Sequence, residues 1–329
     1  MALEGITRHP NLWFEDGNVI LIAEDIGFRV YRGVLARQSE VFRDTFQIPQ
    51  PAAVENDLQD CAIVRLSDDS AEEIAIVLNI LYNGGHSFYR TTVQISFDTA
   101  AAALRLGSKY RFEEMRREAL RRISACYAED LTKVHIHAED SSDDSSKCPI
   151  LWGKEDCIAV FHLARQLSLG GLIPAALYRC ANDVSIDQLF QAVASHSRLY
   201  ILSLQELRDC VQSRADLISE NIQRYRMALE MKPDVPCALA NSSWWQTSNI
   251  SCPQAMKNVV ASAYRKGRFD GALALSPMDG SQEANTKCHS YCAPCEEYFN
   301  TTYTQQRKAI WSRLCNKYRD AHETEQANL

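Results

Sequence analysis

The sequence predicts an α+β fold, a small sheet flanked by helices, for the N-terminal part and a mostly α-helical fold for the rest. Two apolar runs before residue 31 have the patterns of buried strands, whereas later apolar residues recur at helical spacing. A stretch rich in Asp and Ser separates the two parts, because it lacks the apolar residues needed for a core. We expect the following parts: a domain over residues 1–130, an acidic Ser/Asp linker over 131–150, a helical domain over 151–232, and a cysteine-containing helical region over 233–329.

The predicted sheet begins with a hairpin. Residues 18–23 form a continuous apolar run, and Phe28 and Val30 alternate with polar residues in a second strand. Residues 24–27 provide turn chemistry, with Gly27 able to take a positive φ. After a helical segment that ends before two prolines, residues 62–66 are predicted to form a third strand.

Three more helices are predicted in the N-terminal domain. Ser70 and Glu73 have the spacing of a capping box ahead of an apolar stripe over residues 74–81. Residues 97–107 and 111–126 follow with helical periodicity.

The last of these helices carries a cluster of arginines. We interpret it as a solvated face rather than a nucleic-acid patch, because glutamates one turn away neutralise it. The cluster consists of Arg116, Arg117, Arg121 and Arg122.

Beyond the linker only helical patterns are found. Apolar stripes at residues 158–167, 173–180 and 207–229 predict helices that face a core, and Ser185 with Gln188 forms the cap of another. The pattern weakens toward the C-terminus, where residues 255–264 and 297–318 are still predicted to be helical.

Composition and charge exclude several classes of protein. The net charge is −7, so the chain as a whole is not attracted to nucleic acid or to anionic membranes. It contains no apolar run of about 18 residues and no apolar N-terminal segment typical of a signal peptide. We therefore expect a cytoplasmic or nuclear protein whose 12 cysteines are reduced.

The sequence contains no motif typical of an enzyme. A phosphate-binding loop, a nucleophile elbow and an HExxH segment are all absent from it, and its histidines are scattered. We expect a non-enzymatic protein without catalytic residues and without a cofactor other than a metal ion.

One group of cysteines has the spacing of a metal site. Cys288, Cys292 and Cys295 would offer three thiolates to a zinc ion, which binds four such ligands in a tetrahedron. The alternative interpretation is that these residues are reduced thiols packed in a core. Candidates for a fourth ligand are His289, Cys252 and Cys237.

Several segments, in order along the chain, resemble the BTB/POZ family. The resemblance covers residues 11–130, and the amino-acid sequence of its first part is similar to that of the BTB proteins abundant in mushroom-forming fungi. It implies a protein–protein interaction module that forms a homodimer or a heterodimer with another BTB protein. The segments are Trp13-Phe14-Glu15-Asp16-Gly17-Asn18, residues 28–42 (FRVYRGVLARQSEVF), Val64-Arg65-Leu66, residues 80–84 (ILYNG) and residues 104–120 around Gly107-Ser108-Lys109-Tyr110.

The resemblance also implies a dimer surface on the first strand and first helix. The family often has a charged pocket there, made by an Asp that opens the first strand and a basic residue. In this chain Tyr31 replaces the family's usual His, and that Asp is Asn18 or is displaced to Asp16. The candidate interface residues are Phe14, Asp16, Arg32, Val34, Val41 and Phe42.

Recruitment of cullin-3 ubiquitin ligases is a further property of some family members. They carry an apolar-x-Glu motif in the loop after the helix that ends near Phe46, and this chain has Ile48-Pro49-Gln50 there. Ile48 and Gln50 are the candidate partner-loop residues, and Gln50 in place of Glu predicts weak or absent cullin-3 binding. The primary prediction is a scaffold for protein partners. The alternatives are a cullin-3 substrate adaptor and a zinc-stabilised, transcription-linked binding protein.

Overall fold

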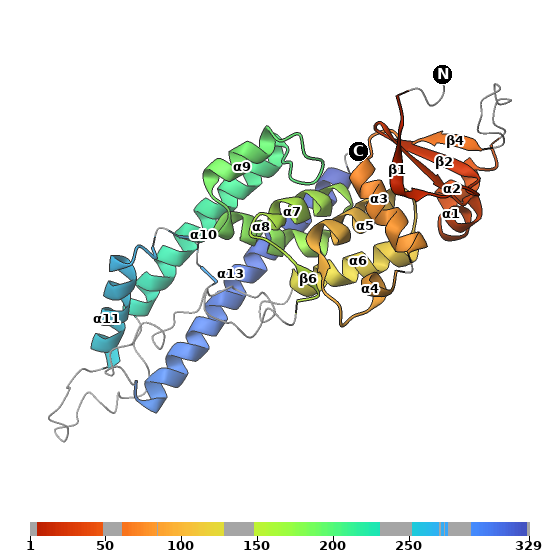
Figure 1. The fold of residues 1–329 in the computed structure, drawn as a ribbon. Helices are drawn as coiled ribbons and strands as arrows, with labels where there is room; N and C mark the ends of the chain where they lie inside the picture. The colour runs from red at the N-terminus through yellow and green to blue at the C-terminus, as the bar shows by residue number, and fades with distance from the viewer. Residues whose placement is uncertain are drawn as a thin grey trace. The chain divides into compact units, whose positions relative to one another are not determined.

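The computed structural model describes residues 5–48, 61–83, 85–127, 148–230, 252–269, 271–272, 274–275 and 291–327. They fall into two compact units (Figure 1). Among the described residues, the first unit comprises 5–127 with 148–156, and the second comprises those from residue 157 onward. The first unit has both strands and helices, and the second is helical, which confirms the fold class expected from the sequence.

A four-stranded mixed sheet is the centre of the first unit. Its strand order is β1-β3-β2-β4. The predicted hairpin is confirmed, because β2 and β3 are antiparallel, while β1 runs parallel to β3 and β4 runs parallel to β2. Every residue of β2 is buried, as its uninterrupted apolar run requires. The strands are β1 (Thr7–Trp13), β2 (Val19–Ala23), β3 (Ile26–Val30) and β4 (Ala62–Arg65).

The hairpin turn differs from the prediction. Glu24, not Gly27, has a positive φ, of 52°, and Gly27 lies within β3. Gly27 is required for another reason: a Cβ there would lie 2.9 Å from Cγ2 of Ile6 and 3.3 Å from the ring of Trp13. The close approach of β1 to β3 therefore depends on the missing side chain. The sequence patterns do not predict β1, because it is mostly exposed and contains Pro10.

Helices α3, α5 and α6 of the first unit form where the cap and the stripes predict them, whereas α4 is not indicated by the sequence. Ser70 accepts a hydrogen bond from the backbone N–H of Glu73 at the start of α3. Helices α5 and α6 can approach closely at Gly107 because this residue has no side chain. A Cβ there would lie only 3.1 Å from Cβ of Arg116. The helices are α1 (Arg32–Gln38), α2 (Glu40–Thr45), α3 (Ala71–Tyr82), α4 (His86–Tyr89), α5 (Phe97–Lys109) and α6 (Glu113–Cys126).

The first unit extends beyond the predicted boundary at residue 130. Strand β6 (Ile150–Leu151) pairs in parallel with β5 (Ile95–Ser96), so residues expected in the linker belong to this unit. A disulfide joins Cys126 at the end of α6 to Cys148. The expectation that all cysteines are reduced is therefore wrong for this pair. Sequence patterns do not indicate this disulfide, because Cys148 is brought to the end of α6 by the pairing of β6 with β5.

Arg122 is completely buried, so its assignment to a solvated basic face is wrong. A guanidinium group has five N–H donors, and all five are used here. Nε donates to Glu118 at 2.8 Å, and the Nη atoms donate to backbone carbonyls at 2.6–3.0 Å. Those carbonyls belong to Phe88 within α4, Arg90 directly after α4, Val93 before β5 and Pro149 directly before β6. Arg122 thus joins α4 and the segments before β5 and β6 to α6.

The second unit is built around α8, whose residues from Ile173 to Ala181 are all buried. Helix α8 packs against both long helices of the unit, α10 and α13 (Figure 1). The predicted cap of α9 is confirmed as a full capping box between Ser185 and Gln188. The elements are α7 (Asp156–Gln166), the 3₁₀ turn η2 (Gly170–Leu172), α8 (Ile173–Asp183), α9 (Ile186–Val193), α10 (Leu204–Glu230), α11 (Cys252–Arg265) and α13 (Ala293–Ala327). In the part of the chain that the structure describes, no helix combines the length and the apolar character needed to cross a membrane.

Arg122→Met is expected to lower the free energy of unfolding by about 3–5 kcal/mol, because it removes a buried cation and strands the carbonyls that it satisfies. Arg121→Met is the matched control. Arg121 pairs with the same carboxylate at 2.7 Å, but its side chain is 46% exposed, so its loss should cost at most about 1 kcal/mol. Urea unfolding of the full chain followed by circular dichroism measures both. Equal losses for the two variants would contradict the role given to Arg122.

Candidate functional site

Three aromatic rings from separate segments of the first unit form a cluster that is only partly buried. Phe14 stacks on Tyr31 with a centroid distance of 5.2 Å, and Tyr82 lies 5.6 Å from Phe14 and 6.0 Å from Tyr31. Phe14 follows β1, Tyr31 precedes α1, and Tyr82 is the last residue of α3. The cluster is therefore an apolar part of the surface that the fold assembles from distant positions in the sequence.

The hydroxyl of Tyr82 holds the cluster to the backbone. It accepts a hydrogen bond from the N–H of Tyr31 at 3.2 Å and donates one to the carbonyl of Tyr31 at 2.9 Å. Burial raises the pKa of Tyr82 to about 12, so the phenol keeps its proton at neutral pH. The hydroxyl of Tyr31 in turn donates to Asp16 at 2.6 Å, and this hydrogen bond raises the pKa of Tyr31.

Arg32 is positioned by contacts inside the same region. Its backbone N–H donates to the side chain of Asn18 at 2.8 Å, and its guanidinium donates to the carbonyl of Phe46. The guanidinium also lies over the ring of Phe46, 5.1 Å from the centroid. Asp16 and Arg32, which the resemblance places in one charged pocket, thus each have a different partner within this chain.

The remaining candidates for a dimer surface separate into two groups. Val34 on α1 and Val41 on α2 are partly exposed. Phe42 is 3% exposed and stacks on Tyr110. Its assignment to an interface is wrong, because α2 turns this side chain into the core. Ile48, after α2, is 62% exposed, and Gln50 lies outside the described residues.

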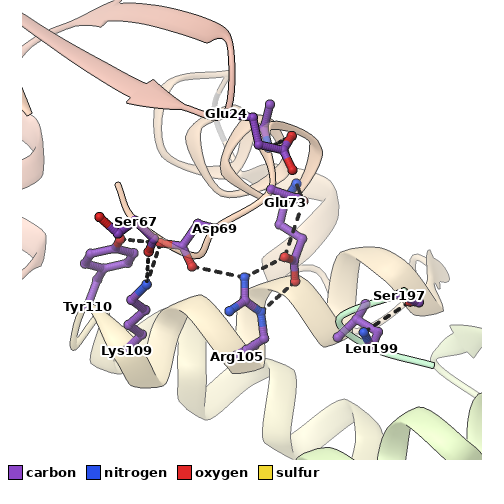
Figure 2. Close-up of polar contacts among 11 residues, drawn as sticks. Glu24, Ser67, Asp69, Glu73, Arg105, Lys109, Tyr110, Ser197 and Leu199 are labelled. Carbon is purple, nitrogen blue, oxygen red and sulfur yellow. Dashed lines mark hydrogen bonds and ion pairs between the residues drawn. The ribbon is translucent and has the colours of Figure 1, made fainter. Parts of the chain in front are cut away.

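A buried carboxylate joins the segment before α3 to α5. Asp69 is 1% exposed and accepts hydrogen bonds from Arg105 at 3.1 Å, from Lys109 at 2.8 Å and from the hydroxyl of Tyr110. Figure 2 shows Arg105 reaching from α5 between Asp69 and Glu73. Its guanidinium donates two hydrogen bonds to the carboxylate of Glu73, at 2.8 and 2.5 Å. Burial and the hydrogen bond to Asp69 raise the pKa of Tyr110 well above its usual value.

This network positions one side of the aromatic cluster. Glu73 belongs to the first turn of α3, and Tyr82 ends the same helix, so the contacts to Arg105 fix α3 against α5. The carboxylate of Glu24 (Figure 2) also accepts a hydrogen bond, at 3.1 Å, from the backbone N–H of Ala71, the first residue of α3. The sequence did not indicate Asp69, because an acid directly before an N-cap serine is typical of an exposed turn.

The structure brings together part of the predicted metal-site set, in the second unit. The sulfur atoms of Cys252, Cys292 and Cys295 all lie within 4.8 Å of one another. Cys252 is one of the residues considered as a fourth ligand, and it lies 40 positions before Cys292 in the sequence. Cys288, His289 and Cys237 lie outside the described residues. The three clustered thiols have the chemistry to hold a soft or borderline metal ion.

A second group of cysteines in this unit is not indicated by the sequence. Cys157, Cys180 and Cys210 come from α7, α8 and α10, and each is completely buried. Burial, together with hydrogen bonds to the other two thiols, raises the pKa of Cys180 well above its usual value. Their complete burial is typical of small apolar side chains packed in a core.

Asp69→Asn is expected to lower the free energy of unfolding by about 3 kcal/mol, because it leaves two buried or partly buried cations facing a neutral amide. Asp68→Asn is the matched control, since Asp68 is exposed. Its φ of 65° also suits asparagine, so this change should stay within about 0.5 kcal/mol of the wild type. Thermal and urea unfolding of the full chain provide the comparison. An unaltered stability of Asp69→Asn would contradict the role of the network.

Comparison with known proteins agrees with this architecture. The sequence model of the BTB/POZ domain family matches residues 14–124. The match begins at Phe14 of the aromatic cluster and ends in α6, so it includes the Asp69 network. None of the curated proteins compared with the chain is similar enough to count as a relative. Residues 14–124 of this chain are thus a BTB/POZ domain, which is a protein–protein interaction module.

Proposed function

We propose that this protein self-associates through its BTB/POZ domain and holds a further protein partner with its helical unit. The observation that supports this most directly is the partly exposed cluster of Phe14, Tyr31 and Tyr82 within the matched residues. Aromatic side chains dominate the energetics of protein interfaces because they bury a large area with few rotatable bonds. The role is one of binding, and the proposal includes no catalytic step.

The proposed occupant of this surface is a second copy of the chain. Val34 follows Tyr31 by one helical turn, and its N–H donates to the carbonyl of Tyr31 at 3.2 Å. The valine therefore continues the apolar surface from the aromatic cluster onto α1, and Val41 adds a partly exposed apolar side chain on α2. Most homodimers have twofold symmetry, in which the same patch is used on both subunits, so one apolar patch per chain is sufficient.

The helical unit provides a separate surface for the further partner. Ile186 and Phe190 lie one turn apart on α9, and they are 44% and 56% exposed. Paired apolar side chains of this kind are typical of a surface that a partner covers. The partner proposed here is a protein of a different sequence, which leaves the BTB/POZ surface available for the second copy.

Sedimentation or light scattering of the full chain at micromolar concentration is expected to give a dimer. Val34→Asp and Val41→Asp should each weaken it by at least about 100-fold, because an unpaired carboxylate in an interface costs on the order of 3 kcal/mol. Val211→Asp is the control: this valine lies on α10 of the second unit and is 38% exposed. It should leave the dimer intact.

A full chain that stays monomeric at ten times that concentration would overturn the self-association proposal. Equal weakening by Val34→Asp and Val211→Asp would place the interface elsewhere. Circular dichroism of each variant separates loss of association from loss of folding.

Service as a cullin-3 substrate adaptor is the second candidate, favoured by the exposure of Ile48 in the segment that follows α2. We expect purified cullin-3 to bind the wild-type chain weakly or not at all, because Gln50 occupies the position of a charged glutamate. Gln50→Glu should strengthen binding by up to about tenfold, the effect of about 1.4 kcal/mol from one added charged contact. Ile48→Ser should remove that gain. Tight binding of the wild-type chain would contradict the alignment of this loop.

A further inference from the structure

The thiols of Cys252, Cys292 and Cys295 have a separation that suits one metal ion. The sulfur atoms of Cys252 and Cys292 are 3.7 Å apart. Two sulfurs bound to one tetrahedral zinc ion, each at about 2.3 Å, are about 3.8 Å apart. All three sulfurs lie within 4.8 Å of one another, so a shift of about 1 Å brings the third to the same spacing.

Two helices begin at this cluster. Cys252 is the first residue of α11, while Cys292 directly precedes α13 and Cys295 lies in its first turn. The N–H groups at a helix N-terminus have no partner within the helix, so they can donate hydrogen bonds to a sulfur ligand. The backbone N–H of Cys292 donates in this way to the sulfur of Cys252 at 3.3 Å.

An apolar shell encloses the cluster. Cys252 and Cys295 are buried, and Cys292 is partly buried. Tyr225, Met256 and Phe299 belong to the same packed group. Such a shell limits the access of water and chelators to a bound ion. Burial alone also suits packed thiols, so the spacing of the three sulfur atoms, all within 4.8 Å of one another, is what distinguishes this cluster.

The group of Cys157, Cys180 and Cys210 provides a contrast within the same unit. Its members come from α7, α8 and α10 and are completely buried. Among the described cysteines, the three sulfur atoms that lie close enough together to share one ion are those of Cys252, Cys292 and Cys295.

We propose that Cys252, Cys292 and Cys295 bind one zinc ion, which fixes the start of α11 to the start of α13. The three thiolates fill three of the four positions that zinc requires. The ion links positions 40 residues apart, and its binding energy adds to the folding energy of the second unit.

Elemental analysis of the full chain, purified under reducing conditions without added metal, is expected to give about one zinc per chain. Cys252→Ser, Cys292→Ser and Cys295→Ser should each reduce the zinc content to a small fraction of that value. Cys180→Ser is the matched control, because it also removes a buried thiol from a three-cysteine cluster in the second unit. It should retain the full zinc content.

Two measurements on the wild-type chain keep the proposal testable if a serine variant fails to fold. Replacement of zinc by Co²⁺ should produce sulfur-to-cobalt charge-transfer absorption whose intensity reports three or more thiolates. Alkylation followed by peptide mapping should label Cys292 only after a chelator is added, while labelling of Cys61, which is partly exposed in the first unit, should not respond to the chelator.

The proposal is overturned if the wild-type chain contains no zinc and takes up no stoichiometric Zn²⁺ or Co²⁺. It is also overturned if Cys180→Ser loses zinc as completely as Cys292→Ser does. A disulfide between Cys252 and Cys292 in protein kept under reducing conditions would assign the cluster to redox chemistry instead.

Discussion

The buried carboxylate of Asp69 is the constraint on which the first unit depends. A charge removed from water must be paired and hydrogen-bonded, and α5 supplies the partners through Arg105, Lys109 and Tyr110. Tyr110 extends the connection, because its carbonyl accepts a hydrogen bond from Ser39, between α1 and α2, and its ring stacks on Phe42. One ionic site thus links the segment before α3, the end of α5 and the first helix pair.

The same constraint explains why the aromatic cluster, the surface that we propose for binding, forms where it does. With α3 held against α5, Tyr82 at its C-terminal end meets Phe14 and Tyr31, which are brought there by the sheet. Arg122 has an equivalent role at another edge, where it satisfies backbone carbonyls of α4 and of the segment before β5. Rigid supports of this kind preorganise an apolar patch, so that binding a partner does not require the patch to be ordered first.

The cysteines of the second unit occur in two kinds of surroundings. Cys157, Cys180 and Cys210 are completely buried among other core residues, whereas the sulfur atoms of Cys252, Cys292 and Cys295 lie within 4.8 Å of one another. A third state occurs in the first unit, where Cys126 and Cys148 form a disulfide. One residue type therefore occurs in three arrangements among the described residues, and spacing in the sequence distinguishes them poorly.

What the sequence determined by itself is the local structure. The sequence correctly predicted the cap at Ser70, the capping box of Ser185 and Gln188, and the buried strand β2. Each of these features depends on residues that lie close together in the chain. The resemblance added the family of the N-terminal domain. Only the tertiary structure decided the burial of Arg122, the partners of Asp69, the need for glycine at position 27 and the meeting of Cys252 with Cys292. In each case the deciding contact joins positions far apart in the chain, and periodicity carries no information about which distant groups will meet.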